Sequence, residues 1–407
     1  MSLIKEIAQY IREGETESER LGLEVEHFVV NDEGRQIGFE EVSALILAVS
    51  TLLGAKTHYM DGYPVGYATE KYSVSLEPSC QFEVSIIPYA EISKIAEVYN
   101  EFYILWNTIF EARGYHFETK GNLPLVENGD ITPDEIPLSP KKRYRYMDRH
   151  FQNSGKYGKY MMRASASVQV SVDYRSEEDL VKKIRVLEKI SPVLMILMES
   201  KSNDDSTPLG EGSDPHLLRI QEWDDLDPER TGYLPGSLEE GYGYEDMARL
   251  VYQTPLILLT DEGETVNVGR LSARDLLEHE VIYEEDLEED HKNRLFEHFI
   301  SMGFFHLRIK KYIEIRVADS NSIEKALGYT ALIKGLIYSP KNMESIEEEL
   351  SDIDRLEKIQ AAVKAIERDG REAIIYGGRK AGEWGEWFKE LAADALSEKE
   401  REYLKNV

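Results

Sequence analysis

Four segments of this sequence alternate polar and apolar residues with a period of two, and this pattern limits the fold more than any other feature. In residues 81–86, Gln81, Glu83 and Ser85 alternate with three apolar residues, and Glu77 stands just before them, joined through Pro78. Such alternation is typical of a strand with one apolar and one polar face. The apolar faces must be buried together, which predicts a sheet packed against other elements.

The other three segments carry carboxylate or amide groups at the same kind of position. These groups are Glu24 and Glu26 in residues 21–30, Gln169 in residues 165–173, and Glu314 with Arg316 in residues 312–317. A polar strand face usually lies in water, and for any one of these strands that remains the simpler interpretation. Because several strands share the pattern, we predict a common polar pocket.

Five carboxylates are directed toward this pocket: Glu24, Glu26, Glu77, Glu83 and Glu314. Burial and mutual repulsion would raise the pKa values of such a cluster. Hard divalent cations remove the repulsion, and Mg²⁺ also binds substrate phosphates. The pattern therefore predicts a metal–nucleotide site.

Basic residues near these segments have two interpretations. They could hold phosphates or the α-carboxylate of an amino acid, or they could form weak surface ion pairs. The residues concerned are Lys141, Arg143, Arg308 and Arg316. For Arg316, on the same strand face as Glu314, we favour a role in the site, whereas for Lys142 and Arg145 we favour solvent.

Composition excludes several classes of protein. Lys and Arg number 48 against 77 Asp and Glu, a net charge of −29, which argues against nucleic acid or an anionic membrane as a partner. No apolar run approaches the roughly 20 residues of a membrane span, and the N-terminus does not resemble a signal peptide. We therefore expect a cytoplasmic protein that acts on small molecules.

Nucleophilic and zinc chemistry find no support in the sequence. Cys80 is the only cysteine, so an internal disulfide or a cysteine zinc site is excluded, and we interpret Cys80 as a buried thiol. His27 falls on the apolar side of its strand and is predicted to pack in the core. A phosphate-binding G-x-x-x-x-G-K-[ST] motif is absent.

Between the strands, apolar residues at helical spacing predict an α+β protein without an evident linker. Helices are expected from Leu3 up to Gly14 and at residues 41–53, 90–114, 176–198 and 322–338. Loops are expected at residues 124–140, 153–160 and 203–214, and residues 284–290 are expected to be a solvated acidic stretch. Residues 1–407 are interpreted as one catalytic domain whose charged C-terminal region, from about residue 342, is helical.

An ordered set of motifs resembles the plant-type and actinobacterial glutamate–cysteine ligases. L-E-P-S-C-Q-F-E at residues 76–83 is similar to the family signature L-E-P-G-G-Q-F-E. Further matches are L-E-V-E-H-F with T-E-H-E-K-F, P-K-K-R-Y with P-K-G-R-Y, S-V-Q-V-S-V-D with T-V-Q-V-N-L-D, R-T-G-Y-L-P with R-T-G-x-L-P, and R-I-K-K-Y-I-E-I-R-V-A-D with R-L-K-R-Y-L-E-M-R-x-A-D. They keep their order from about residue 20 to residue 340. The departures are Ser79-Cys80 for the glycine pair, Ser171 for asparagine, and the absence of the plant cysteines.

The resemblance implies a glutamine synthetase-like fold, in which an antiparallel sheet curls into a funnel surrounded by helices. It implies ATP-dependent joining of the γ-carboxylate of glutamate to the amine of cysteine, the first step of glutathione or related thiol biosynthesis, with two or three Mg²⁺ ions. By position it implies metal binding by the five glutamates and catalysis by Arg316 and Glu83. ATP or glutamate would contact Lys141, Arg143, Arg308 and Arg316, and substrate would contact Gln81, Gln169 and Arg230.

Two alternatives remain open from the sequence. One is a ligase of the same chemistry with another amine acceptor, because no segment identifies a cysteine pocket. The other is a catalytically silent protein that binds Mg-nucleotide or an amino acid. The resemblance leaves the oligomeric state open.

Overall fold

A computed structural model describes residues 3–202, 213–261, 264–278 and 288–407. The predicted loop at residues 203–214 and the acidic stretch at residues 284–290 lie largely outside these residues. Within the described part of the chain, no helix combines the length and apolar character needed to cross a bilayer.

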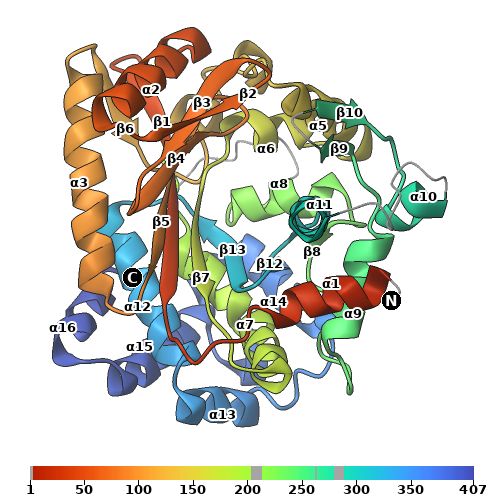
Figure 1. The fold of residues 1–407 in the computed structure, drawn as a ribbon. Helices are drawn as coiled ribbons and strands as arrows, with labels where there is room; N and C mark the ends of the chain where they lie inside the picture. The colour runs from red at the N-terminus through yellow and green to blue at the C-terminus, as the bar shows by residue number, and fades with distance from the viewer. Residues whose placement is uncertain (1–2, 203–212, 262–263, 279–287) are drawn as a thin grey trace.

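Nine of the described strands form one antiparallel sheet, which confirms the predicted fold class (Figure 1). Its order is β12-β13-β7-β1-β5-β4-β3-β2, and β6 pairs with the far half of β1. The bounds are β1 Leu21–Asn31, β2 Lys56–Met60, β3 Tyr63–Ala68, β4 Tyr72–Leu76, β5 Phe82–Tyr89, β6 Tyr115–Glu118, β7 Ser167–Val172, β12 Leu307–Ile309 and β13 Ile313–Asp319. Two small sheets pair β9 (Leu258–Asp261) with β10 (Glu264–Asn267), and β8 (Thr231–Gly232) with β11 (Phe304–Phe305).

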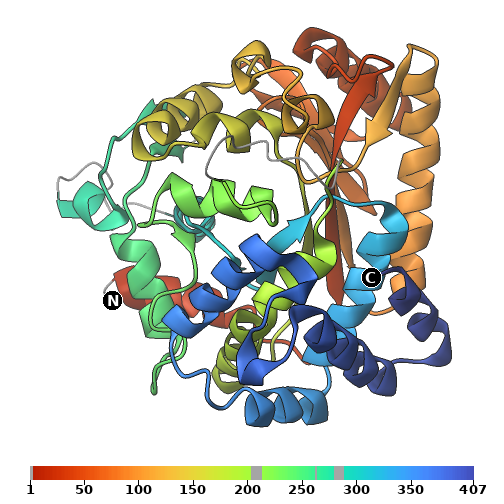
Figure 2. The same ribbon diagram turned by 180° about the vertical axis from the view of Figure 1, so that it is seen from behind.

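Helices cover both faces of the sheet (Figures 1 and 2). On the apolar face lie α3 (Ile92–Glu111), α7 (Glu177–Met198) and α12 (Ile323–Ile337). Over the polar face lie α5 (Lys142–Ser154), α6 (Gly158–Ala164), α8 (Leu218–Leu226) and α11 (Glu289–Ser301). The other α-helices are α1 Leu3–Arg12, α2 Phe39–Leu53, α4 Pro124–Glu127, α9 Tyr244–Gln253, α10 Ala273–Glu278, α13 Pro340–Glu349, α14 Leu356–Asp369, α15 Ala381–Ala395 and α16 Glu398–Arg401.

The alternation in β1 works as predicted. Leu23 and Val25 are fully buried against the helices, whereas Glu24 and Glu26 keep access to the polar side. His27 is also buried, and its ring nitrogens contact the Phe82 carbonyl oxygen at 2.9 Å and the Tyr99 hydroxyl at 2.8 Å. The prediction that His27 packs in the core is therefore confirmed, and burial lowers the pKa of its imidazole to about 4.

Helix boundaries follow local signals where such signals exist. Ser176 caps α7 by accepting a hydrogen bond from the Asp179 amide, and Ser322 caps α12 in the same way. Gly54 ends α2 in a left-handed conformation with φ of 62°. The C-terminal region from residue 342 is mainly helical, as expected.

One loop prediction was wrong, and a second was correct only in part. Residues 153–160 are largely helical, since α5 continues to Ser154 and α6 begins at Gly158. Residues 124–140 contain α4 and a 3₁₀ turn, Pro133–Glu135. Both segments are anchored by tertiary packing of residues such as Phe151 and Val126, which outweighs their weak local helix propensity.

Glu188 in α7 predicts a measurable dependence of stability on pH. It is fully buried, one oxygen accepts a hydrogen bond from the Leu234 amide at 3.0 Å, and burial raises its pKa to about 8. Because this pKa lies above the value of about 4.5 for an exposed glutamate, its contribution to stability is intact below about pH 4.5 and is lost as the pH rises through 8.

We therefore expect Glu188→Gln to match the wild type in urea unfolding at pH 5 and to exceed it by a few kcal/mol at pH 9. Glu178→Gln, at an exposed position of the same helix, is the control and should change neither value. Identical pH profiles for Glu188→Gln and the wild type would contradict the assignment.

Candidate active site

A polar pocket of about 300 Å³ lies on the face of the sheet opposite the main apolar core. Strands β1, β5, β7 and β13 form its floor, and α5, α6 and α8 form its walls. All five predicted carboxylates line it, together with Gln81, Gln169, Arg143, Arg308 and Arg316. The prediction that the polar strand faces share one pocket is therefore confirmed.

Strand register places the acidic groups opposite one another. Glu26 on β1 pairs directly with Glu83 on β5, and Glu24 pairs with Gln169 on β7. Like charges at directly opposed positions destabilise a sheet. A structure that retains this arrangement must gain something from the concentrated negative charge.

Burial and repulsion act together on these carboxyls. Burial, followed by the charge of Glu314, raises the pKa of Glu24 to about 7. Burial, followed by the charge of Glu24, raises the pKa of Glu83 well above its usual range, and burial also raises the pKa of Glu26. The site therefore favours either protons or cations at these carboxyls.

Hydrogen bonds fix two of the carboxylates in place. Glu26 accepts from the Ser167 amide at 2.7 Å and from the Ser167 hydroxyl at 2.9 Å. Glu83 accepts from the Ser75 hydroxyl at 3.1 Å and from the Ser85 hydroxyl at 2.9 Å. Serines on the same strand and on neighbouring strands thus orient the acidic groups.

Glu314 differs from the other four because it is surrounded by cations. Its oxygens lie 2.7 Å from Lys310 Nζ, 2.8 Å from an Arg316 nitrogen and 3.0 Å from an Arg308 nitrogen. Burial disfavours the ionised form, but the three cations, Arg308 above all, hold the pKa of this carboxyl well below its usual range. One end of the pocket is therefore positive and the other negative.

The donor set of the negative end fits a hard divalent cation. Glu24, Glu77 and Glu83 make no ion pair with a basic residue in the described chain, and carboxylate oxygens are the ligands that Mg²⁺ prefers. In this conformation no three acidic, histidine or cysteine side chains of the described residues are gathered tightly enough to form a ready-made metal site. The carboxylate donors line one pocket without forming such a cluster.

Gln169 links the two ends of the pocket. Its amide nitrogen donates to Glu26 at 3.2 Å, and its oxygen accepts from Arg316 at 2.7 Å. Arg316 lies over the Trp223 ring, 6.0 Å from its centroid. The guanidinium of Arg316 is thus fixed by Gln169, Glu314 and an aromatic face.

The sequence analysis missed several residues of the pocket lining, among them Arg219, Trp223 and Lys310. Arg219 is buried and donates to the Arg316 carbonyl at 3.1 Å, while one of its terminal nitrogens has no partner among the described residues. The spacing of four between Arg219 and Trp223 places both on one face of α8. Lys310 has the same strand parity as Arg308 and Glu314, which was a readable signal.

Two predicted contact residues lie outside the pocket lining. Lys141 is buried beside it, where its ammonium donates to the Leu76 carbonyl oxygen at 2.5 Å and lies over the Tyr144 ring. Arg230 is fully buried and binds Asp227 at 2.8 Å and the Pro255 carbonyl oxygen at 2.5 Å. Burial lowers the pKa of Lys141 to about 8.

Gln81 lies in the pocket wall with both ends of its amide engaged. Its oxygen accepts from the Ser79 amide at 2.8 Å, and its nitrogen donates to the Ser165 carbonyl at 3.0 Å. Gln81 therefore holds the turn before β5 against the entrance to β7.

Ser79 and Cys80, which stand where the family signature has two glycines, belong to a tight turn from Glu77 to Cys80. The Cys80 amide donates to the Glu77 carbonyl at 3.0 Å, and Cys80 adopts a positive φ of 68°. Glycine adopts this conformation without strain, whereas other residues do so at a cost. The Cys80 thiol is buried, as predicted, and burial raises its pKa to about 12.

We expect Cys80→Val to be less stable than Cys80→Gly by about 1–3 kcal/mol in urea unfolding, because a β-branched residue resists positive φ. Burial of the larger apolar side chain favours valine, so a lower stability of the valine variant must come from the backbone. A valine variant that is more stable than the glycine variant would contradict the expected strain.

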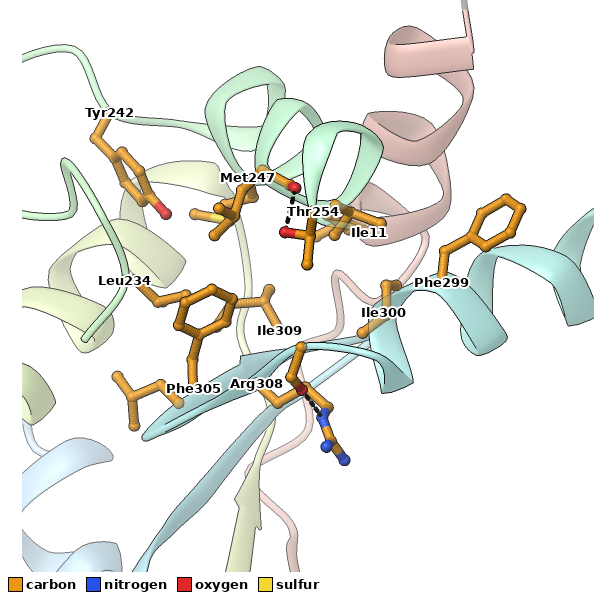
Figure 3. Close-up of a pocket in the computed structure, with 14 residues that line it drawn as sticks. Ile11, Leu234, Tyr242, Met247, Thr254, Phe299, Ile300, Phe305, Arg308 and Ile309 are labelled. Atoms are coloured by element: carbon orange, nitrogen blue, oxygen red, sulfur yellow. Dashed lines mark hydrogen bonds between the residues drawn. The ribbon is translucent and has the colours of Figure 1, made fainter. Parts of the chain in front are cut away.

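Behind β12, the stem of Arg308 forms part of an apolar pocket, shown in Figure 3. Leu234, Met247, Phe305 and Ile309 line it, and the guanidinium of Arg308 points away from them. Its Nε donates to the Gly303 carbonyl at 3.0 Å. This packing fixes the direction in which Arg308 enters the polar pocket.

The sequence matches the model of glutamate-cysteine ligase family 2 (GCS2) over residues 20–407. The chloroplastic glutamate–cysteine ligase of Medicago truncatula is 25% identical over 340 residues, which are 83% of this chain and 63% of the relative. Glutamate–cysteine ligase B of Oryza sativa subsp. japonica is 26% identical over 340 residues, 83% of this chain and 64% of the relative. The chain thus spans less than two thirds of the length of these plant relatives.

Among solved structures, a crystal structure of glutamate–cysteine ligase (gshA) from Francisella tularensis in complex with AMP superposes with a TM-score of 0.49 at 11% identity, covering 96% of this chain and 81% of that one. A bifunctional glutathione synthetase from Pasteurella multocida gives a TM-score of 0.46 at 13% identity, covering 99% and 49%. The family match extends over nearly the whole chain and includes every strand that lines the polar pocket. The chain therefore belongs to glutamate-cysteine ligase family 2.

Proposed function

We propose that this protein is an ATP- and Mg²⁺-dependent ligase that joins the γ-carboxylate of L-glutamate to the amine of L-cysteine. Family membership supports the reaction class. The observation that carries the proposal is the division of one buried pocket into a carboxylate end and a cationic end joined by Gln169. A metal-bound nucleotide and an amino acid need such an arrangement, because their phosphates and carboxylates require both kinds of partner.

In this proposal Glu24, Glu26, Glu77 and Glu83 would hold Mg²⁺. Glu314, the fifth carboxylate of the predicted set, would join them while it keeps Arg316 in place. Bound Mg²⁺ would supply charge neutralisation to the β- and γ-phosphates of ATP. We propose two or three ions, the number that the family resemblance implies. Glu83 would contribute to catalysis as one of the negative charges that hold Mg²⁺.

The cationic end is prepared for substrate before binding. Arg316 is held by Gln169 and Glu314, so its remaining N–H groups can stabilise the transferring phosphoryl group with little reorganisation. Arg143 and Arg308 would bind phosphate oxygens. Arg219, with a nitrogen that has no partner among the described residues, would bind a substrate carboxylate.

The reaction then proceeds in two balanced steps. A γ-carboxylate oxygen of glutamate attacks the γ-phosphorus of ATP, the bond to the bridging oxygen breaks, and ADP leaves. The amine of cysteine attacks the carbonyl carbon of the resulting γ-glutamyl phosphate, loses a proton, and phosphate departs with the former carboxylate oxygen.

Lys141 and Arg230, which were also predicted to contact substrate, would act indirectly through neighbouring residues. Lys141 anchors the carbonyl of Leu76, the residue just before Glu77, so we assign it a positioning role for that carboxylate. Arg230 holds Asp227, which also binds His150 on α5 at 2.7 Å. It therefore fixes the wall of the pocket near the substrate.

The proposal is tested by measuring phosphate release with ATP, Mg²⁺ and glutamate across a panel of amines, with product masses determined. We expect release to require all three components, with cysteine as the best acceptor and γ-glutamylcysteine as the product. A clear preference for another amine would replace cysteine as the acceptor. Absence of release with every amine would favour a silent binding protein.

A further inference from the structure

The two-residue turn between β2 and β3 contacts the start of helix α5. Asp61 and Gly62 both have positive φ, 51° and 85°, and they join the paired residues Met60 and Tyr63. Asp-Gly is a preferred sequence for a hairpin turn of this type. The Asp61 carboxylate also accepts a hydrogen bond at 2.8 Å from the backbone amide of Lys142, the first residue of α5. The hairpin therefore caps a helix from another part of the chain.

Helix α5 needs this partner because its own sequence supplies none. Its N-cap residue, Lys141, makes no capping hydrogen bond through its side chain, and the first turn contains no acidic residue. Lys142 and Arg143 place cations at the end of the helix where the dipole is positive, which is unfavourable. Asp61, whose side chain is only 11% exposed, supplies both the missing acceptor and a negative charge.

Arg143 is the cation of this first turn that enters the polar pocket. It lines the pocket beside Tyr144, and its buried Nε has no hydrogen-bond partner among the described residues. Lys141 and Tyr144 of the same turn donate to the Leu76 carbonyl oxygen. The turn is thus fixed by its contacts with Leu76 and Asp61, whereas the guanidinium of Arg143 keeps a donor for a ligand.

We propose that Asp61 is a positioning residue for nucleotide binding, which fixes the first turn of α5 and thereby directs Arg143 toward the phosphates of ATP. The inference rests on the proposed function, in which Arg143 binds phosphate oxygens. Asp61 itself does not line the pocket, so it acts only through the helix. Because Arg143 would hold phosphate in the ground state and in the transition state alike, loss of Asp61 weakens nucleotide binding rather than the chemical step.

The test measures the Kd of MgATP by titration calorimetry without glutamate, and then the KM for ATP and kcat in phosphate release. Asp61→Gly removes the carboxylate without straining the positive φ. We expect Kd and KM to rise by about tenfold, the effect of losing one helix cap, while kcat stays within about twofold of the wild type. A merely structural defect would instead lower kcat, through a smaller folded fraction, at unchanged KM.

Two further variants separate the hydrogen bond from other effects of Asp61. Asp61→Asn keeps an acceptor oxygen and suits the same turn, so its Kd should stay within about threefold of the wild type. Lys142→Met removes the ammonium that lies 3.7 Å from Asp61 but keeps the backbone amide, and its Kd should match the wild type. Circular dichroism verifies that each variant is folded.

A double-mutant cycle assigns the effect to Arg143. Arg143→Met should itself raise the Kd, and in that background Asp61→Gly should cause no further rise, because the residue that it positions is gone. An unchanged Kd in Asp61→Gly or in Arg143→Met would overturn the inference, and the Arg143→Met result applies even if Asp61→Gly fails to fold. Equal rises in both backgrounds, or an Asp61→Asn variant as weak as Asp61→Gly, would also overturn it.

Failure of the proposed function gives a different result. A wild type that binds MgATP but releases no phosphate with any amine would contradict the ligase reaction. The calorimetric comparison of Asp61→Gly with the wild type would still decide the role of Asp61, because it requires no turnover.

Discussion

Replacing Arg316 by methionine is expected to lower kcat by about 10²- to 10³-fold, the loss that follows removal of a preorganised transition-state contact. Arg316 is buried and fixed at 2.7 Å by Gln169 and at 2.8 Å by Glu314. Methionine keeps much of the stem, and Arg308 and Lys310 still neutralise Glu314 in the variant. Steady-state kinetics with saturating ATP and glutamate measures the effect.

Arg145→Met is the matched control, because it removes a cation of the same kind at an exposed position of α5. Its kcat should stay close to that of the wild type. If Arg316→Met behaved like Arg145→Met, Arg316 would have no part in the chemical step and the cationic end of the pocket would need another role.

Glu83→Gln should lower turnover by about 10²-fold while making the protein more stable in Mg²⁺-free buffer. Glu83 faces Glu26 across the strand pair, and burial and its neighbours raise the pKa of this carboxyl. The amide keeps the shape and removes one charge, so it relieves repulsion and weakens metal binding. In urea unfolding without Mg²⁺, the variant should therefore have a higher free energy of unfolding than the wild type. At saturating Mg²⁺ the order should be reversed.

Two control variants distinguish this effect from the loss of an exposed charge and from a general loss of stability. Glu17→Gln, in a side chain that is 93% exposed, should be silent in both assays. Val25→Thr, on the fully buried face of β1, should lower stability by about 1–3 kcal/mol while leaving the turnover of the folded fraction intact. Normal turnover of Glu83→Gln at saturating Mg²⁺ would contradict a role for this carboxylate.

Strand parity made the site predictable from sequence because a period of two assigns each side chain to a face. Because Leu23 and Val25 face the core, Glu24 and Glu26 must face the opposite side of the strand. The same reasoning placed Glu83 and Glu314, and the predicted pocket unites them. Parity extends only along a strand, so it could not specify that Glu26 lies opposite Glu83.

Strand parity could not predict the positions of residues on helices and turns. Arg219 enters the pocket from α8, whose position over the sheet depends on tertiary packing rather than on local pattern. Lys141 is directed to the Leu76 carbonyl by the start of α5, and a basic cluster in the sequence does not distinguish that from a phosphate contact. The positive φ of Cys80 is likewise invisible at a non-glycine residue.

The most direct test of the ligase mechanism follows the oxygen atoms of the substrate. Glutamate labelled with ¹⁸O in its γ-carboxylate is incubated with ATP, Mg²⁺ and cysteine, and the released phosphate is analysed by mass spectrometry. Activation through γ-glutamyl phosphate predicts that each phosphate carries one ¹⁸O atom. Phosphate that is formed together with the γ-glutamyl product but contains no ¹⁸O would contradict it.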